Sequence, residues 1–338
     1  MIKNIQLLRA IAAISVMICH FESFTKYLFG FQLNGRGVDL FFVISGCVMA
    51  LTTRDRHPSG LNFFKNRIAR VVPTYWLLTL AVFSVALVAP KLLGATRPNF
   101  IELIDSLLFI PFIKSSGLYQ PVLFLGWTLN LEMFFYAIFA IFLSMKNYTH
   151  SLIGIAVTLM AIVAAAPLMP AHSVWHDFYG NPMMIEFAMG LAVPYLADFI
   201  LPKLRSRRMP LVIASVLALP TIFLCDLLAP EVPNLVIALI AGTAAAVLVV
   251  SAIALERIGF IYAGAIGVSL GNASYSLYLI HPFVTQPIQR IVLAKTHSPA
   301  LISISLVAGS ALILLCAVLM FRLIERPISK AAKAALRG

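Results

Sequence analysis

The sequence has very few charged residues for its length. Asp, Glu, Lys and Arg make up only 11% of its 338 residues, whereas 61% are hydrophobic, and its mean hydropathy is +0.96. No soluble domain of this size is so apolar, and no polar segment is long enough to form one. We therefore predict an all-α integral membrane protein, with residues 1–338 in a single transmembrane domain and no appended soluble domain.

Acidic residues and cysteines are also scarce. Asp and Glu number 13 against 25 Lys and Arg, which gives a net charge of +12. The basic residues lie in short loops between apolar segments, which indicates membrane topology and not nucleic-acid binding. The four cysteines lie inside apolar segments without the spacing of metal ligands. Neither a disulfide framework nor a metal site is therefore predicted.

Apolar segments of spanning length recur along the whole chain. They lie at 5–25, 37–53, 71–89, 123–145, 151–169, 183–201, 211–229, 234–254, 264–284 and 300–323. This pattern predicts a bundle of about ten transmembrane helices, since each segment is close to the length that crosses a bilayer. Most Lys and Arg then fall in loops on the side of the N-terminus, so both termini are predicted to be cytoplasmic. A helix in the membrane interface is predicted within the long loop 90–122.

Two polar side chains interrupt the first apolar segment. A continuous helix would place Arg9 and His20 on one face, about 16 Å apart along its axis. Such residues are costly to insert into a membrane, and they usually mark a pathway, a relay or a site. The structural alternative for His20 is a hydrogen-bonded histidine of the helix core. We favour a functional role, because a cation shares its face.

Counting depth along each predicted helix sorts the polar residues by side. The outer half is predicted to hold His20, Asp39, Glu132 and His281, and the inner face Arg9, Arg67 and Arg70. This polarity suits a reaction whose anionic donor comes from the cytosol and whose acceptor lies outside. Arginine binds phosphates through its planar fork of donors, and a neutral buried histidine is a suitable base for a hydroxyl. The alternative roles are membrane anchors for the arginines, an ion pair between helices for Glu132, and a helix cap for His281.

The same residues belong to motifs that resemble the membrane acyltransferase 3 family. The motifs occur in family order over nearly the whole chain: Arg9 to His20, 37–46 (GVDLFFVISG), 67–76 (RIARVVPTYW), 126–136 (GWTLNLEMFFY), 274–282 (SYSLYLIHP) and 325–327 (ERP). The opening of the chain looks most like the exopolysaccharide-production O-acetyltransferases of that family. A minor departure is Asn130, where many relatives carry a smaller residue.

The resemblance implies an enzyme of the bacterial inner membrane. It would move an acyl group, usually acetyl, from cytosolic acetyl-CoA to a hydroxyl of an envelope or secreted glycan, or of a lipid-linked saccharide. Metal is not expected, and the expected partners are the acyl-CoA, the glycan and membrane lipids. The sequence does not determine whether the protein forms a homo-oligomer, or which glycan and which of its hydroxyls is acylated. It also leaves open whether transfer is direct or passes through an acyl-enzyme.

Carried over by motif, the resemblance also implies roles for single residues. His20 would be the catalytic histidine, with Asp39 and Glu132 orienting it or the acceptor. Arg67 and Arg70 would bind coenzyme A, and Arg9 would line the same path. The predicted acceptor-binding residues are Trp127, Asn130, Tyr278 and His281, of which Asn130 and Tyr278 are also candidate oxyanion donors.

A transporter or flippase of a glycan or lipid-linked precursor is the alternative function. Intramembrane Arg, His and Glu also build proton relays. Such a protein is expected to have inverted repeats and helices broken at corresponding positions of two halves. The sequence indicates neither feature, so we favour the acyltransferase.

Overall fold

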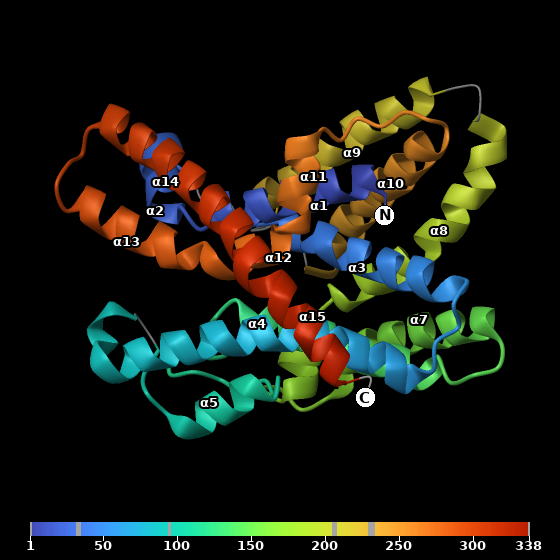
Figure 1. Ribbon diagram of the computed structural model, residues 1–338, viewed down its shortest axis with the longest axis horizontal. Helices are drawn as coiled ribbons and strands as arrows, with labels where there is room; N and C mark the ends of the chain where they lie inside the picture. The colour runs from blue at the N-terminus through green and yellow to red at the C-terminus, as the bar shows by residue number, and fades with distance from the viewer. Residues whose placement is uncertain (1, 32–34, 94–95, 205–207, 229–233, 337–338) are drawn as a thin grey trace. The chain divides into compact units, whose positions relative to one another are not determined.

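The computed structural model describes residues 2–31, 35–93, 96–204, 208–228 and 234–336. Within these residues the regular structure is helical, and the chain divides into two compact units (Figure 1). Unit 1 comprises residues 1–51 and 185–323, and unit 2 comprises 52–184 and 324–338. Each unit is described by itself.

Unit 1 contains the first three helices and most of the second half of the chain. Its helices are α1 (Lys3–Cys19), α2 (Glu22–Phe29), α3 (Gly37–Arg54), α8 (Met184–Leu204), α9 (Met209–Leu228), α10 (Asn234–Arg257), α11 (Ala265–Asn272), α12 (Ser274–Ile280), α13 (Pro282–Leu293) and α14 (Pro299–Met320). α1 packs against α10, α11 and α12, while α14 packs against α2, α12 and α13 (Figure 1).

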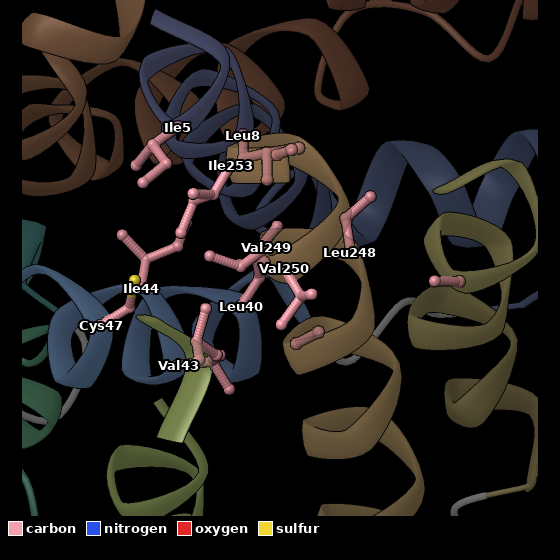
Figure 2. Packing of buried hydrophobic residues seen from close by; sticks show 14 of the residues in the cluster. Ile5, Leu8, Leu40, Val43, Ile44, Cys47, Leu248, Val249, Val250 and Ile253 are labelled. Atoms are coloured by element: carbon pink, nitrogen blue, oxygen red, sulfur yellow. The ribbon is translucent and has the colours of Figure 1, made fainter. Parts of the chain in front are cut away.

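The core of unit 1 is formed by aliphatic side chains of α1, α3 and α10. Leu40 and Val43 of α3 lie beside Val249 and Val250 of α10, with Leu8 of α1 in the same cluster (Figure 2). These side chains are all at most 5% exposed. Because lipid is as apolar as they are, close packing and satisfied polar groups hold such helices together more than exclusion of water does.

Glycines allow the closest helix contacts in this unit. A Cβ at Gly271 of α11 would lie 1.9 Å from the carbonyl oxygen of Gln6 in α1, and one at Gly267 would lie 2.7 Å from Leu7. These two glycines therefore allow α11 to pack closely on α1. Gly46 of α3 and Gly190 of α8 meet in the same way, because a Cβ on either would lie within 2.3 Å of a backbone oxygen of the other helix.

The end of α10 caps the start of α1. The backbone N–H groups of Lys3 and Asn4 donate to the carboxylate of Glu256, at 2.9 and 2.7 Å. The Asn4 side chain in turn donates to the carbonyl oxygens of Ala252 and Phe260. These bonds satisfy donors that a helix N-terminus leaves without partners, so they anchor α1 in the position from which it carries His20.

Unit 2 is built around an antiparallel pair, α4 and α6. Its elements are α4 (Gly60–Val88), η1 (Pro90–Leu92), α5 (Phe100–Leu107), α6 (Gly126–Phe142), α7 (Tyr148–Ala165), η2 (Ala166–Leu168), η3 (Trp175–Tyr179) and α15 (Arg326–Ala335). Gly60 approaches Ala140 at one end of the pair, and Gly126 approaches Tyr75 at the other. α15 packs on α4, and α5 is a helix within the loop 90–122, where one was predicted.

Among the described residues, six helices are long and apolar enough to cross a membrane, and the chain is a membrane protein. They cover the segments predicted at 37–53, 71–89, 151–169, 183–201, 234–254 and 300–323. The other four expected spans differ: α6 and the described part of α9 are shorter apolar helices, 5–25 is bent, and 264–284 forms α11, α12 and the start of α13. Two of the predicted spans, 5–25 and 264–284, are therefore broken and not continuous.

Candidate active site

His20 lies where the first helix breaks. α1 ends at Cys19 and α2 begins at Glu22, with a bend of 76° between them. The Nδ1 atom of His20 lies 2.8 Å from the carbonyl oxygen of Val16, which also accepts from the His20 backbone N–H at 3.3 Å. A side chain that competes for a helix carbonyl in this way favours the end of a helix. The helix that was expected to be continuous over 5–25 is thus broken after Cys19.

The hydrogen bond also determines which ring nitrogen of His20 carries a proton. A carbonyl oxygen only accepts, so Nδ1 donates to Val16, and in a neutral ring Nε2 is the acceptor. His20 is half-buried. This is the tautomer in which Nε2 can take a proton from a hydroxyl or attack a carbonyl carbon.

His281 lies at a second helix break and contacts His20. The two ring centroids are 4.7 Å apart and the rings are tilted by 58°. α12 ends at Ile280, and Pro282 begins α13, because proline has no N–H to continue the hydrogen-bond ladder of α12. His281 is fully buried, and its Nδ1 lies 3.2 Å from the carbonyl oxygen of Leu277. Its Nε2 has no hydrogen-bond partner among the described residues.

Two other predicted residues, Arg9 and Tyr278, lie on α1 and α12, the helices that end next to these two histidines. Arg9 is half-buried on α1, where its guanidinium donates to the side-chain oxygen of Gln6 at 3.3 Å. Tyr278 is buried, with its ring centroid 6.1 Å from that of His281 and 6.3 Å from that of Phe41 in α3. The structure thus places Tyr278 next to His281, and Arg9 on the helix that ends at His20.

Asp39 belongs to a buried acidic pair that includes a residue we did not predict. Asp39 and Glu186 are fully buried, and each acts electrostatically on the other. Arg36 lies 3.5 Å from the Asp39 carboxylate, and Gly242 of α10 leaves the space that the Glu186 side chain fills. Glu186 could have been found, since it is an acidic residue inside the apolar segment 183–201.

Arg67 and Glu132 meet around Tyr136 in unit 2. The Tyr136 hydroxyl donates to the carboxylate of Glu132, and Arg67 interacts with both groups. The Cζ atom of Arg67 lies 5.6 Å from the ring centroid of Phe63. The Nε and Nη1 atoms of Arg67 are buried, with no hydrogen-bond partner among the described residues. Two directed donors are thus available for an anionic group. Tyr136 is the last residue of the motif at 126–136, but the sequence alone does not show that it lies between Arg67 and Glu132.

This contact corrects the predicted separation of Arg67 from Glu132 by membrane depth. α4 begins at Gly60, capped by the Ser59 hydroxyl, and not near residue 71. Arg67 and Arg70 therefore lie inside a 29-residue helix and not in a loop before it. In the antiparallel pair, the second and third turns of α4 lie beside the middle of α6, which carries Glu132.

The remaining predicted residues of unit 2 lie on the same two helices. The carbonyl oxygen of Arg70 accepts from the Ser329 hydroxyl of α15 at 3.5 Å. Asn130 is buried, and its Oδ1 atom has no hydrogen-bond partner within the part of the chain that the structure describes. Trp127 is half-buried in the first turn of α6. The described residues contain no group of three or more His, Cys, Asp or Glu that could hold a metal ion.

These side chains form two clusters that could take part in chemistry, one in each unit. In unit 1 the facing histidines supply an acceptor nitrogen that is suited to general-base or nucleophilic chemistry. In unit 2 Arg67 supplies buried donors that suit a phosphate or carboxylate.

Comparison with known proteins identifies the family of this chain. The acyltransferase domain that defines the acyltransferase 3 family matches residues 2–322. The exopolysaccharide production protein ExoZ of Rhizobium meliloti (strain 1021) is 32% identical over 90% of this chain and 92% of its own length. The acyltransferase MdmB of Streptomyces mycarofaciens is 26% identical over 81% of this chain and 76% of its own length. No solved structure matches.

Proposed function

Since the chain belongs to the acyltransferase 3 family, we propose that it is an O-acetyltransferase of the bacterial inner membrane. It takes acetyl groups from cytosolic acetyl-CoA and transfers them to a hydroxyl of a secreted or envelope glycan. The observation that carries this proposal is the pair of contacting imidazoles, His20 and His281, at two facing helix breaks. The name of the Rhizobium relative supports an exopolysaccharide, or its lipid-linked precursor, as the acceptor.

The proposed topology has about ten membrane crossings, with both termini in the cytoplasm. It counts the six long helices, the bent pair α1–α2, the shorter helices α6 and α9, and the broken segment α11–α12 as crossings. A broken helix is tolerated at membrane depth when other parts of the protein satisfy its freed backbone groups.

In the proposed reaction His20 acts as the general base. Its Nε2 takes the proton of the sugar hydroxyl while the hydroxyl oxygen bonds to the thioester carbonyl carbon. The tetrahedral intermediate then breaks its carbon–sulfur bond, and the proton on His20 passes to the departing coenzyme A thiolate. The alternative is attack by Nε2 itself, which expels the coenzyme A thiolate and gives an acetyl-histidine. The sugar hydroxyl then takes the acetyl group and gives its proton to the thiolate, which restores the histidine.

The donor and acceptor are proposed to use the other residues of the two clusters. Arg67 and Arg70 bind the phosphates or the pantetheine region of acetyl-CoA, and Arg9 lines its path towards His20. Asp39 and Glu132 orient His20 or the acceptor. The acceptor and the developing oxyanion contact Trp127, Asn130, Tyr278 and His281.

The decisive experiment removes the imidazole of His20. Purified His20→Ala protein should insert and fold as the wild type does, but release no coenzyme A thiol in the presence of acetyl-CoA and glycan. His150→Ala, which removes an exposed histidine at the start of α7, is the matched control and should keep full activity. Mass spectrometry of the polysaccharide made with and without the gene identifies the acyl group. Normal acylation by His20→Ala would refute the proposed role.

A further inference from the structure

One face of α13 carries three buried polar residues. His281, Thr285 and Gln289 follow one another at intervals of four residues, so they lie on the same side of the helix. They are 0%, 0% and 6% exposed, respectively. Gln286, one residue after Thr285, is exposed. The buried stripe begins at the histidine that contacts His20.

Gln289 holds both ends of the break between α1 and α2. Its amide nitrogen Nε2 donates to the carbonyl oxygen of His20 at 2.9 Å and to that of Thr285 at 3.1 Å. Its oxygen Oε1 accepts from the backbone N–H of Ser23 at 2.9 Å and of Phe24 at 3.3 Å. One side chain therefore contacts the last carbonyl before the break and the first amides after it.

These backbone groups need a partner from elsewhere in the protein. The residue that precedes α2, Phe21, offers no side-chain oxygen to cap the helix. A helix that ends or begins at membrane depth leaves amides and carbonyls that no water satisfies. Gln289 supplies to α2 the cap that its own sequence lacks, and it supplies a donor to the end of α1.

We propose that Gln289 is a positioning residue for the acyl transfer, which rests on the function proposed above. By fixing the backbone of His20, it fixes the direction of the imidazole relative to His281. It touches neither substrate. Catalysis loses about 100-fold when a reacting group is displaced by about 1 Å, so a loosened break should reduce kcat and leave the KM for acetyl-CoA almost unchanged.

The test compares Gln289→Met with Gln286→Met. Methionine has a similar length and no hydrogen-bonding amide, so Gln289→Met removes all four bonds, while Gln286→Met makes the same change on the exposed face of α13. We expect kcat to fall about 100-fold in Gln289→Met, at unchanged KM for acetyl-CoA, and to stay at the wild-type value in Gln286→Met. A second variant, Gln289→Glu, keeps the acceptor for Ser23 and Phe24 and loses the donor to His20. The kcat of Gln289→Glu should fall about 10-fold.

A readout that needs no turnover separates this proposal from the proposed function. In protein labelled with ¹⁵N-histidine, the imidazole resonances of His20 should shift in Gln289→Met and not in Gln286→Met. If wild-type protein transfers no acyl group, the proposed function fails, and the resonances alone decide the positioning role. Unshifted resonances, or an unchanged kcat in an active protein, would overturn it. If neither Gln289 variant inserts and folds, the residue is structural only, and the proposal is likewise overturned.

Discussion

Replacing Arg67 by methionine should abolish most of the binding of acetyl-CoA without unfolding the protein. The Nε and Nη1 donors of Arg67 are buried and have no hydrogen-bond partner among the described residues, which is the state expected of a group that awaits an anion. Glu132 keeps its bond from the Tyr136 hydroxyl when the guanidinium is removed. Because Arg67 also interacts with Tyr136 and Glu132, the unliganded variant should melt lower than the wild type, and the shift on adding ligand is measured from each variant's own unliganded melting temperature.

The magnitude follows from the bonds that are lost. A hydrogen bond to a charged group contributes about 1.5–3 kcal/mol, so the loss of one such bond raises the Kd for acetyl-CoA by about 10- to 100-fold. At a ligand concentration 100 times Kd, binding stabilises the wild type by about 2.7 kcal/mol. With an unfolding entropy of about 2 cal/mol/K for each of its residues, this corresponds to a shift in melting temperature of about 4 °C. In Arg67→Met the shift should fall to between about 2 °C and about 0.6 °C, for a 10-fold and a 100-fold loss of affinity respectively.

Thermal unfolding in detergent, with and without acetyl-CoA, measures this difference. The matched control is Lys65→Met, which removes a cation from α4 two residues earlier, on the far side of the helix. It should keep the full shift. If both variants keep the full shift, Arg67 does not bind the donor and serves as an anchor of α4.

Two further predictions concern stability. Burial lowers the pKa of Lys114 from 10.5 to about 8. Between these two pH values the unfolded chain binds more protons than the folded one, so stability rises with pH. At pH 7 the charge of Lys114 therefore destabilises the fold. Lys114→Met should raise the melting temperature at pH 7 and lose this advantage by pH 10.5, whereas the exposed Lys91→Met should gain nothing. Gly271→Ala should lower the unfolding free energy by about 3 kcal/mol, because its Cβ would overlap the Gln6 carbonyl. Gly264→Ala, whose Cβ meets nothing within 4 Å, should be neutral in the same thermal unfolding assay.

The sequence predicted the class of the fold better than the number and continuity of its helices. Long apolar segments identify spans because lipid tolerates few charges, and six of them form helices of spanning length. Hydropathy does not register where a helix breaks, so 5–25 and 264–284 looked continuous. The start of α4 was placed too late for the opposite reason, since Lys65, Arg67 and Arg70 make its first turns look like a loop.

Candidate site residues stand out in the sequence where a charge or an imidazole interrupts an apolar segment. His20 and Glu132 were found by that signal, and Glu186 carries the same signal but was passed over. Tyr136 and Gln289 carry no charge, so their roles depend on the helix that lies opposite. Only the structure shows that Tyr136 joins Arg67 to Glu132, and that Gln289 bonds the backbone of His20.

The two helix breaks of unit 1 depend on each other. A break in a lipid environment is stable only if protein groups satisfy the backbone that it frees. The break after His20 is satisfied by Gln289 of α13, and α13 begins at the second break, where Pro282 ends α12. The segment that Pro282 redirects therefore carries both the imidazole that contacts His20 and the amide that holds its backbone. A proline at position 282 thus bears on the geometry of a histidine in the first helix, although the two are far apart in sequence.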